Sequence, residues 1–394
     1  MQRFFSIALC VFAFVVPFVC AAQSELVPEK VTMMTAKVLH IDTQEVRDVP
    51  GTNTKTNFQT IRVEVLDGVE KGKQVTVDND YLSLKVGEVF YMTHTSESLD
   101  GTDYYTVNDP YRLPSLFLLV ALFVGVVFVF GGKQGIRGLV SLVGSFLAIF
   151  YILLPAILHG YSPLFVTVGV ASVIIVLGSY VTHGFTRSTT AAVIGMILTV
   201  CVTGAIAYWS VGLTRLSGFG SEEAVYLNLN ANGSIDILGL LLGGIIIGLL
   251  GVLYDAAIGQ AVSVEELLRI APHVSKKIIY ERAVRIGREH IGALVNTLAI
   301  AYVGASLPLL LLFYQTTNAG VLPTLNTEIF ATEIVRIMVG SIGLVLAIPI
   351  TTVVAVWFLG RRASGTVEAH IHDAELAQLS AEEHAHSHSH THTH

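Results

Sequence analysis

Charged residues are scarce in this 394-residue chain. Only 13% of its residues are Asp, Glu, Lys or Arg, whereas an ordinary soluble domain is nearer a quarter charged. This shortage excludes a conventional soluble domain for most of the length. Apolar residues take the place of charge, since 53% of the chain is hydrophobic and its mean hydropathy is +0.66. Most of the chain is therefore expected to be solvated by lipid.

Cysteines and catalytic motifs are scarce as well. The chain has three cysteines; Cys10 and Cys20 fall in a segment expected to be removed, and Cys201 lies in an apolar stretch, where a lone thiol serves packing. The sequence also lacks a phosphate-binding loop, a Gly-x-Ser-x-Gly elbow, a His-Glu-x-x-His pair and clustered cysteine ligands. We therefore expect no enzymatic activity and no catalytic residue.

The amino end has the pattern of a signal peptide. Arg3 precedes an apolar run over residues 4–19, which is short for a membrane-spanning helix, and small residues at Cys20 and Ala22 suit cleavage after Ala22. The segment 1–22 is thus expected to be a signal peptide. A retained anchor helix is the alternative.

Residues 23–112 change to an alternation of period two, which is typical of strands. Turn residues separate the runs, as at Asp67-Gly68 and Lys71-Gly72. Five short strands predict a small extracytoplasmic β-barrel-like domain of OB type. Such a domain either binds a partner or only folds back on the helices. The expected strands are 32–42, 58–66, 74–77, 88–95 and 104–107.

Residues 113–360 contain about seven apolar stretches, each near the ~20 residues that a transmembrane helix needs. An odd number of spans, entered from an exported domain, leaves the carboxyl end in the cytoplasm. The fold class is therefore an α-helical polytopic membrane protein with an N-terminal β domain. The stretches are 114–130, 136–158, 164–181, 190–209, 235–253, 291–313 and 334–358.

The basic residues support the same orientation. Cytoplasmic loops of membrane proteins carry an excess of Lys and Arg. The loops expected outside carry Arg215 and the acidic Glu222, Glu223 and Glu328. The pattern indicates a multi-pass protein of the bacterial cytoplasmic membrane, with the β domain outside. The basic residues of the loops expected inside are Lys133, Arg137, Arg187, Arg269, Lys276, Lys277, Arg282, Arg285, Arg288, Arg361 and Arg362.

Five polar residues in the apolar stretches or at their ends are candidates for transport or coupling, because such groups are costly in hydrocarbon unless they are paired. Asp255 and Asn296 could reach similar depth on neighbouring helices and form a proton or cation site, or they could only anchor a helix end and bond across helices. Glu333 and Arg336 have the i, i+3 spacing of an ion pair and form either an interfacial salt bridge or part of an exit gate. His290 completes the set.

Glycines concentrate in the stretch 235–253. Glycines four residues apart let a neighbouring helix approach closely, for static packing or for sliding. The glycines assigned to helix packing are Gly239, Gly243, Gly244, Gly248 and Gly251.

Residues 260–290 read as an amphipathic cytoplasmic hairpin of two helices broken at Pro272. Ser263 and Glu266 have the spacing of a capping box at a helix start. The basic residues of the hairpin could contact anionic lipid or couple the protein to a cytoplasmic partner.

The last segment, 361–394, is a histidine-rich cytoplasmic tail. Neutral imidazoles ligate zinc, nickel and copper, and a tail can bring several of them to one ion. Weak metal capture, a purification tag and a biased tail of no consequence all fit the pattern, and no other cofactor is expected. The candidate ligands are His384, His386, His388, His390, His392 and His394.

Four segments between Gly239 and Thr352 carry a resemblance to a known family. They are Gly251–Asp255, Gly287–Thr297, Gly304–Leu310 and Thr332–Leu344. On these residues the chain resembles the YibE/F-like family of bacterial multi-pass membrane proteins. The resemblance implies an envelope membrane protein and brings no established substrate.

Two functions from different classes fit these observations. The first is a transporter or transport subunit of the cell envelope, of unidentified substrate and linked to an ion or a metal. The second is a non-transporting assembly or regulatory protein that acts through its β domain. The lipid bilayer is the expected partner. A further partner would be an envelope protein or a second copy of the chain, and no nucleic acid is expected.

Overall fold

The computed structural model describes residues 30–48, 55–96, 103–316 and 320–388. The chain divides into two compact units, Met1–Phe123 and Val124–His394. The expected signal peptide and three of the tail histidines, His390, His392 and His394, lie outside the described residues.

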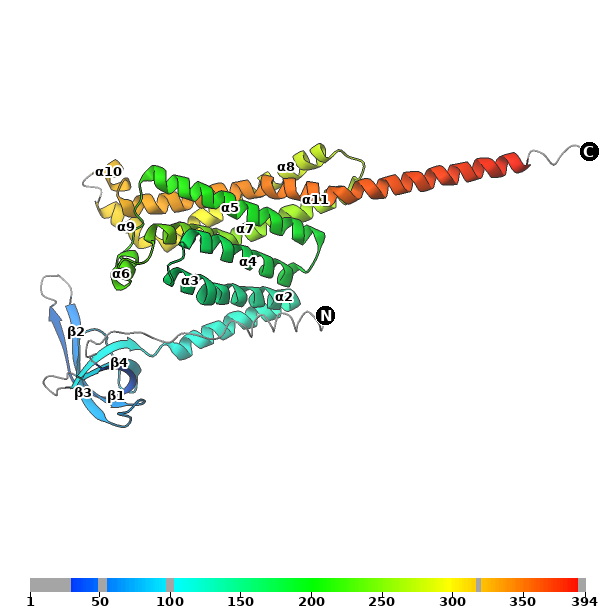
Figure 1. The fold of residues 1–394 in the computed structure, drawn as a ribbon. Helices are drawn as coiled ribbons and strands as arrows, with labels where there is room; N and C mark the ends of the chain where they lie inside the picture. The colour runs from blue at the N-terminus through cyan, green and yellow to red at the C-terminus, as the bar shows by residue number, and fades with distance from the viewer. Residues whose placement is uncertain (1–29, 49–54, 97–102, 317–319, 389–394) are drawn as a thin grey trace, which may run out of the picture. The chain divides into compact units, whose positions relative to one another are not determined.

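The first unit contains a five-stranded antiparallel sheet that curves into a half-barrel (Figure 1). The strands follow the order β3-β2-β1-β4-β5 across the sheet. They lie where the alternating pattern predicts strands. Their bounds are β1 Lys30–Asp48, β2 Lys55–Val65, β3 Gln74–Asn79, β4 Val89–Ser96 and β5 Asp103–Pro110.

Alternation along the strands builds the core of this sheet. Met34, Ala36 and Val38 of β1 face inward at intervals of two and are at most 2% exposed, because successive side chains of a strand point to opposite faces. Phe90 and Met92 of β4 continue the same core. β1 can pair with β2 and β4 over its 19 residues because register shifts bend it between Val38 and Thr43.

Hydrogen bonds link Tyr105 of β5 to Glu70 and Lys73 in the turn before β3. The Lys73 Nζ donates to the Tyr105 hydroxyl at 2.8 Å and to Glu70 Oε1 at 2.7 Å. The Tyr105 hydroxyl donates in turn to Glu70 Oε2 at 2.7 Å. These bonds hold the two edges of the half-barrel near each other at one end.

The remaining elements are helical. Helix lengths and breaks follow the apolar stretches and the Gly and Pro residues between them. The bounds are α2 Leu113–Ala148, the π-helix η1 Ile149–Leu153, α3 Leu154–Leu158, α4 Pro163–His183, α5 Arg187–Thr214, α6 Glu222–Asn230, α7 Ile237–Ile270, α8 Lys276–Ala305, α9 Leu307–Thr316, α10 Val321–Leu325 and α11 Glu328–His388.

Five helices of the described chain are long and apolar enough to cross a membrane. A sixth span results if α8 and α9, which are bent by 69° at Ser306, count as one. The chain is thus a multi-pass membrane protein, but the expected count of seven spans is not confirmed. Leu113–Leu158 is one helical segment here, although its backbone is non-helical at Gly132, with φ 51° and ψ −139°.

The centre of the second unit is formed by α5, α7 and α11, which run side by side (Figure 1). α5 and α11 are antiparallel, and a glycine of each helix packs against a threonine of the other. A Cβ added at Gly195 of α5 would lie 2.6 Å from Thr351 Oγ1 of α11, and one at Gly343 of α11 would collide with the Thr203 hydroxyl of α5. Both contacts require glycine, so the two helix axes can approach closely.

The region 260–290 consists of the end of α7, a turn over residues 271–275 and the start of α8. α7 continues to Ile270 without a break, so the expected capping box at Ser263 is wrong. Inside the helix, the Ser263 hydroxyl donates to the Gly259 carbonyl at 2.8 Å instead.

Candidate functional site

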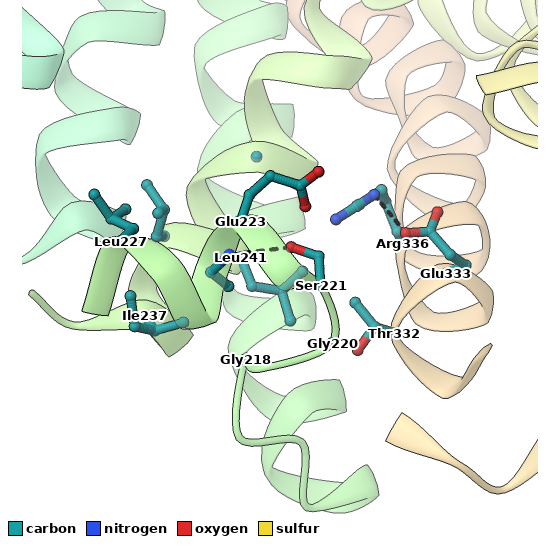
Figure 2. A pocket seen from close by; sticks show the side chains of 13 residues that line it. Gly218, Gly220, Ser221, Glu223, Leu227, Ile237, Leu241, Thr332, Glu333 and Arg336 are labelled. Carbon is teal, nitrogen blue, oxygen red and sulfur yellow. Dashed lines mark hydrogen bonds and ion pairs between the residues drawn. The ribbon is translucent and has the colours of Figure 1, made fainter. Parts of the chain in front are cut away.

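A small cavity lies at the end of the helical unit where α5 ends and where α7 and α11 begin (Figure 2). Its volume is about 200 Å³. The loop between α5 and α6, the start of α6, and the first turns of α7 and α11 line it. Its charged residues are Glu223 of α6 and Glu333 and Arg336 of α11.

Local capping places the helices that form the walls. The Ser221 hydroxyl accepts the backbone N–H of Ala224 at 3.3 Å, which starts α6 and sets Glu223 in its first turn. Asp236 accepts the N–H of Gly239 at 2.9 Å and starts α7 in the same way. Short polar residues in the sequence therefore determine where each wall begins.

The loop between α5 and α6 is fastened to the first residue of α11. The Glu328 Oε1 accepts the Ser217 N–H at 2.8 Å, the Ser217 hydroxyl at 2.6 Å and the Gly218 N–H at 2.9 Å. Gly218 has φ +91°, and a Cβ there would lie 2.9 Å from the Ile237 carbonyl carbon, so glycine is required. These bonds keep the loop against α7 and α11.

Arg336 and Glu333 form an ion pair inside the cavity. The Arg336 Nη1 donates to Glu333 Oε1 at 2.7 Å, and the side chains are 30% and 20% exposed. The Ser306 hydroxyl donates to Glu333 Oε2 at 3.1 Å, so both carboxylate oxygens have partners. The i, i+3 spacing predicts this pair. Arg336 is separated along the axis of α11 by about 12 Å from Glu328, the residue that holds the loop between α5 and α6.

Glu223 faces the ion pair from the opposite wall. Figure 2 shows its carboxylate and the Arg336 guanidinium directed toward one another across the cavity. Its own backbone N–H and then the Ser221 hydroxyl hold the pKa of Glu223 below its usual range. Glu223 is therefore ionised at neutral pH, and the cavity holds two carboxylates for one guanidinium.

Thr332 contributes a hydroxyl without a partner. The residue is 4% exposed, and within the described chain its Oγ1 has no hydrogen-bond partner. It lies against Gly220, where a Cβ would approach Oγ1 to 2.7 Å. Buried hydroxyls are usually paired, so this one is an unsatisfied polar group enclosed in the wall of the cavity.

The structure separates the other coupling candidates from this cavity. Asp255 on α7 and Asn296 on α8 are exposed on their helices, and no hydrogen bond or ion pair joins them among the described residues. His290 is exposed on α8 as well. Of the five residues singled out from the sequence, the structure brings together Glu333 and Arg336.

The glycines of α7 are of two kinds. A Cβ added at Gly243 would lie 2.6 Å from Thr167 Oγ1 of α4, which is too close for a larger residue. Gly239 and Gly248 have similarly close neighbours on α4 and α8. A Cβ at Gly244, which lines the cavity, at Gly251 or at Gly259 would meet nothing within 4 Å.

A second polar cluster lies deeper and was not identified from the sequence. The Gln260 Nε2 donates to the Ala283 carbonyl at 2.8 Å and to Thr352 Oγ1 at 2.7 Å. Gln260 is 3% exposed, and Gly287 leaves room for it, since a Cβ there would lie 2.6 Å from its Oε1. These bonds join α7, α8 and α11 at one point.

The described residues contain no group of three or more His, Cys, Asp or Glu side chains that could hold a metal ion. Metal capture by the tail histidines stays a prediction. Three of them, His384, His386 and His388, belong to the helix α11 as described.

Sequence reasoning missed Glu223 and Thr332 for identifiable reasons. Glu223 was read as one of several acidic residues in a loop, a pattern that indicates topology and nothing else. Thr332 looked like an ordinary residue of an apolar helix. The capping serine two residues before Glu223 was the available signal that this acid is fixed in the first turn of a helix.

Comparison with known proteins identifies a family. A family model described as YibE/F-like protein matches residues 119–361, which is more than half of the chain and includes all of α7, α8 and the cavity residues. Neither a curated protein nor a solved structure matches the chain.

Proposed function

We propose that this chain, which belongs to the YibE/F-like family, is a membrane transporter or transport subunit that moves a small charged or polar solute through its helical unit. The cavity supports this proposal. It places Arg336 and Glu333 near the start of the apolar helix α11, with Glu223 of the short helix α6 facing them. Such groups are costly in a membrane and mark pathways for ions or substrates.

We further propose seven membrane spans, with α2 forming two of them. A Cβ added at Gly135 would lie 2.6 Å from the Val127 carbonyl oxygen, whereas eight residues of straight helix extend about 12 Å. The chain therefore folds back near Gly132, where the backbone is non-helical. Two antiparallel helices before and after Gly132 raise the number of spans to seven when α8 and α9 count as one.

The distribution of basic residues supports an orientation for these spans. Lys133 lies at the proposed reversal of α2, and Lys276 and Lys277 lie at the turn between α7 and α8. Placing these turns in the cytoplasm puts the cavity and the half-barrel on the exported side of the bacterial cytoplasmic membrane, with the carboxyl end inside. The cavity then opens toward the compartment from which a solute would enter or into which it would leave.

The half-barrel supports a second candidate function, the binding of an envelope partner. A groove of about 430 Å³ lies between its edge strands and is lined by residues 78–81 and 106–109. Pairing of β3 with β5 would close an OB-type barrel, and the unpaired edges could instead accept an extended peptide. Crosslinking from Tyr81 in cells, with Lys85 as the control position, tests this function.

Flux into sealed liposomes tests the transport function. We expect the purified protein to move at least one of a panel of solutes comprising protons, magnesium, manganese, zinc, nickel and small amino acids. Replacement of Arg336 by Gln should abolish that flux because it leaves Glu333 without its partner. Glu222→Gln is the matched control, since Glu222 lies beside Glu223 but does not line the cavity.

Two further variants separate the alternative sites. Asp255→Asn should leave the flux unchanged if the cavity is the coupling site, and a chain truncated after Gly365 tests the histidine-rich tail. Vesicles that are well sealed and show no flux of any solute would overturn the transport function and favour partner binding by the half-barrel.

A further inference from the structure

Arg336 has hydrogen-bonding capacity that the described protein does not use. A guanidinium carries five N–H donors, and in the described chain Arg336 bonds Glu333 alone, through Nη1. The side chain is only 30% exposed, so most of it is withdrawn from bulk water. The remaining donors fit a carboxylate, which matches the planar fork of a guanidinium in charge and geometry.

Glu223 has the opposite requirement. The pair of Arg336 and Glu333 is electrically neutral, so Glu223 gives the cavity one excess negative charge. Its carboxylate is directed across the cavity toward Arg336 (Figure 2), at the wall formed by α6. A cationic group placed between the two walls on the Glu223 side would neutralise that charge.

These two requirements decide between classes of ligand. A simple anion would satisfy Arg336 but would be repelled by both carboxylates, whereas a simple cation would satisfy Glu223 but would be repelled by Arg336. Arg336 is partly buried, whereas Glu223 is exposed, so the cost of an unpaired charge falls on Arg336, and Glu223 contributes its attraction for a cation. We propose that the cavity binds a small zwitterion with one carboxylate, held by Arg336, and one ammonium group, held by Glu223.

The size and walls of the cavity limit the zwitterion further. A volume of about 200 Å³ is below the ~300–1,000 Å³ of sites for drug-sized ligands. Leu227, Ile237 and Leu241 supply an apolar wall. A short α-amino acid fits this combination. This inference rests on the proposed function only in assigning the cavity to a transport path.

Calorimetric titration of the full-length protein in detergent tests the inference with three probes of similar size. L-alanine carries both charged groups, propionate lacks the ammonium group and ethylammonium lacks the carboxylate. We expect L-alanine to bind and the other two to bind at least about tenfold more weakly, because each leaves one charged residue unsatisfied. Equal binding of the three probes, stronger binding of either fragment, or no binding of L-alanine would overturn the inference.

Glu223→Gln provides a test that a loss of folding cannot imitate. Glu223 is exposed at the cavity wall, so the variant should fold. Loss of a charged hydrogen bond should weaken L-alanine binding about 10- to 100-fold, while propionate, relieved of one repulsion, should bind more tightly than to the unmodified protein. Glu222→Gln is the control and should preserve the preference for L-alanine.

Binding and flux fail in distinguishable ways. L-alanine that binds but does not enter liposomes contradicts transport and leaves the ligand class standing. Flux of another solute by a protein that does not bind L-alanine contradicts the ligand class and leaves transport standing.

Discussion

Two buried threonines of α11 have hydroxyls in opposite circumstances. The Thr352 hydroxyl accepts Gln260 Nε2 at 2.7 Å and donates to the Ile348 carbonyl at 2.6 Å, while the Thr332 hydroxyl has no partner in the described chain. The same residue type therefore has a structural role at one position and an open hydrogen-bonding capacity at the other. A sequence cannot make this distinction, because it depends on residues that are distant in the chain. Gln260 lies beside Thr352, and Gly220 lies beside Thr332.

Replacing each threonine by valine separates the two roles. Thr352→Val removes an acceptor from buried Gln260 and should lower the free energy of unfolding by ~1–3 kcal/mol. Thr332→Val exchanges an unpaired hydroxyl for a methyl group and should leave stability unchanged or raise it. Unfolding by heat in detergent, with both variants measured together, checks this, and equal losses would contradict the assignment.

Acid should loosen the half-barrel through Glu70. Hydrogen bonds from Lys73 and then from Tyr105 hold the pKa of Glu70 below its usual 4.5. The folded state thus favours the ionised carboxylate; its stabilisation is complete above pH 4.5 and is lost as pH falls through the lower pKa of the folded state. The protection factors of β5 amides in the full-length protein, which correct for the pH dependence of intrinsic exchange, should fall over that range, and Glu70→Gln should remove the dependence. A variant that retains it would contradict the role of Glu70.

At the scale of elements, the strands and most helices were predictable. Alternation and apolar run length are local properties, and they located β1 to β5 and the apolar parts of α4, α5, α7, α8 with α9, and α11 near their observed positions. The prediction of a helix start at Ser263 was wrong because α7 continues through this residue. The Ser263 hydroxyl bonds the carbonyl of the preceding turn and caps no helix. The short helix α6 was not anticipated, since its acidic first turn reads as a solvated loop.

The reciprocal contacts between α5 and α11 make a testable statement about packing. Gly195→Ala places a Cβ 2.6 Å from Thr351 Oγ1 and should destabilise the protein by ~1–3 kcal/mol, as overpacked cores do. Gly251→Ala is the matched control, because its Cβ would meet nothing within 4 Å and helix propensity favours alanine by ~1 kcal/mol. In thermal unfolding in detergent, the midpoint of Gly195→Ala should lie below that of the unmodified protein and the midpoint of Gly251→Ala above it. A Gly195→Ala variant as stable as the unmodified protein would exclude close approach of these helices.

For the whole molecule, composition established the membrane class, and the number of crossings depends on one residue. The apolar stretches 114–130 and 136–158 predict two crossings, whereas Leu113–Leu158 is one helical segment by length and composition. The backbone at Gly132 and the proximity of Val127 to Gly135 favour two crossings. The cavity could not be predicted at all, since its walls are separated in sequence by more than a hundred residues.

Thiol labelling of intact cells distinguishes the two topologies. Single cysteines are introduced at Lys85, Ser162 and His273 in a chain that carries Cys10→Ala, Cys20→Ala and Cys201→Ala, because all three native thiols would otherwise compete for the reagent. With seven spans, an impermeant reagent should label positions 85 and 162 directly and position 273 only after permeabilisation. A single crossing by Leu113–Leu158 would instead place Ser162 on the side opposite Lys85.

The bend between α8 and α9 is hydrogen-bonded to a charged residue of the cavity. Ser306 lies at the 69° bend and donates its hydroxyl to Glu333, the partner of Arg336. A ligand that draws Arg336 away from Glu333 therefore changes the charge that the Ser306 hydroxyl faces. One hydrogen bond therefore connects the break between two helices to the charged pair that faces the cavity.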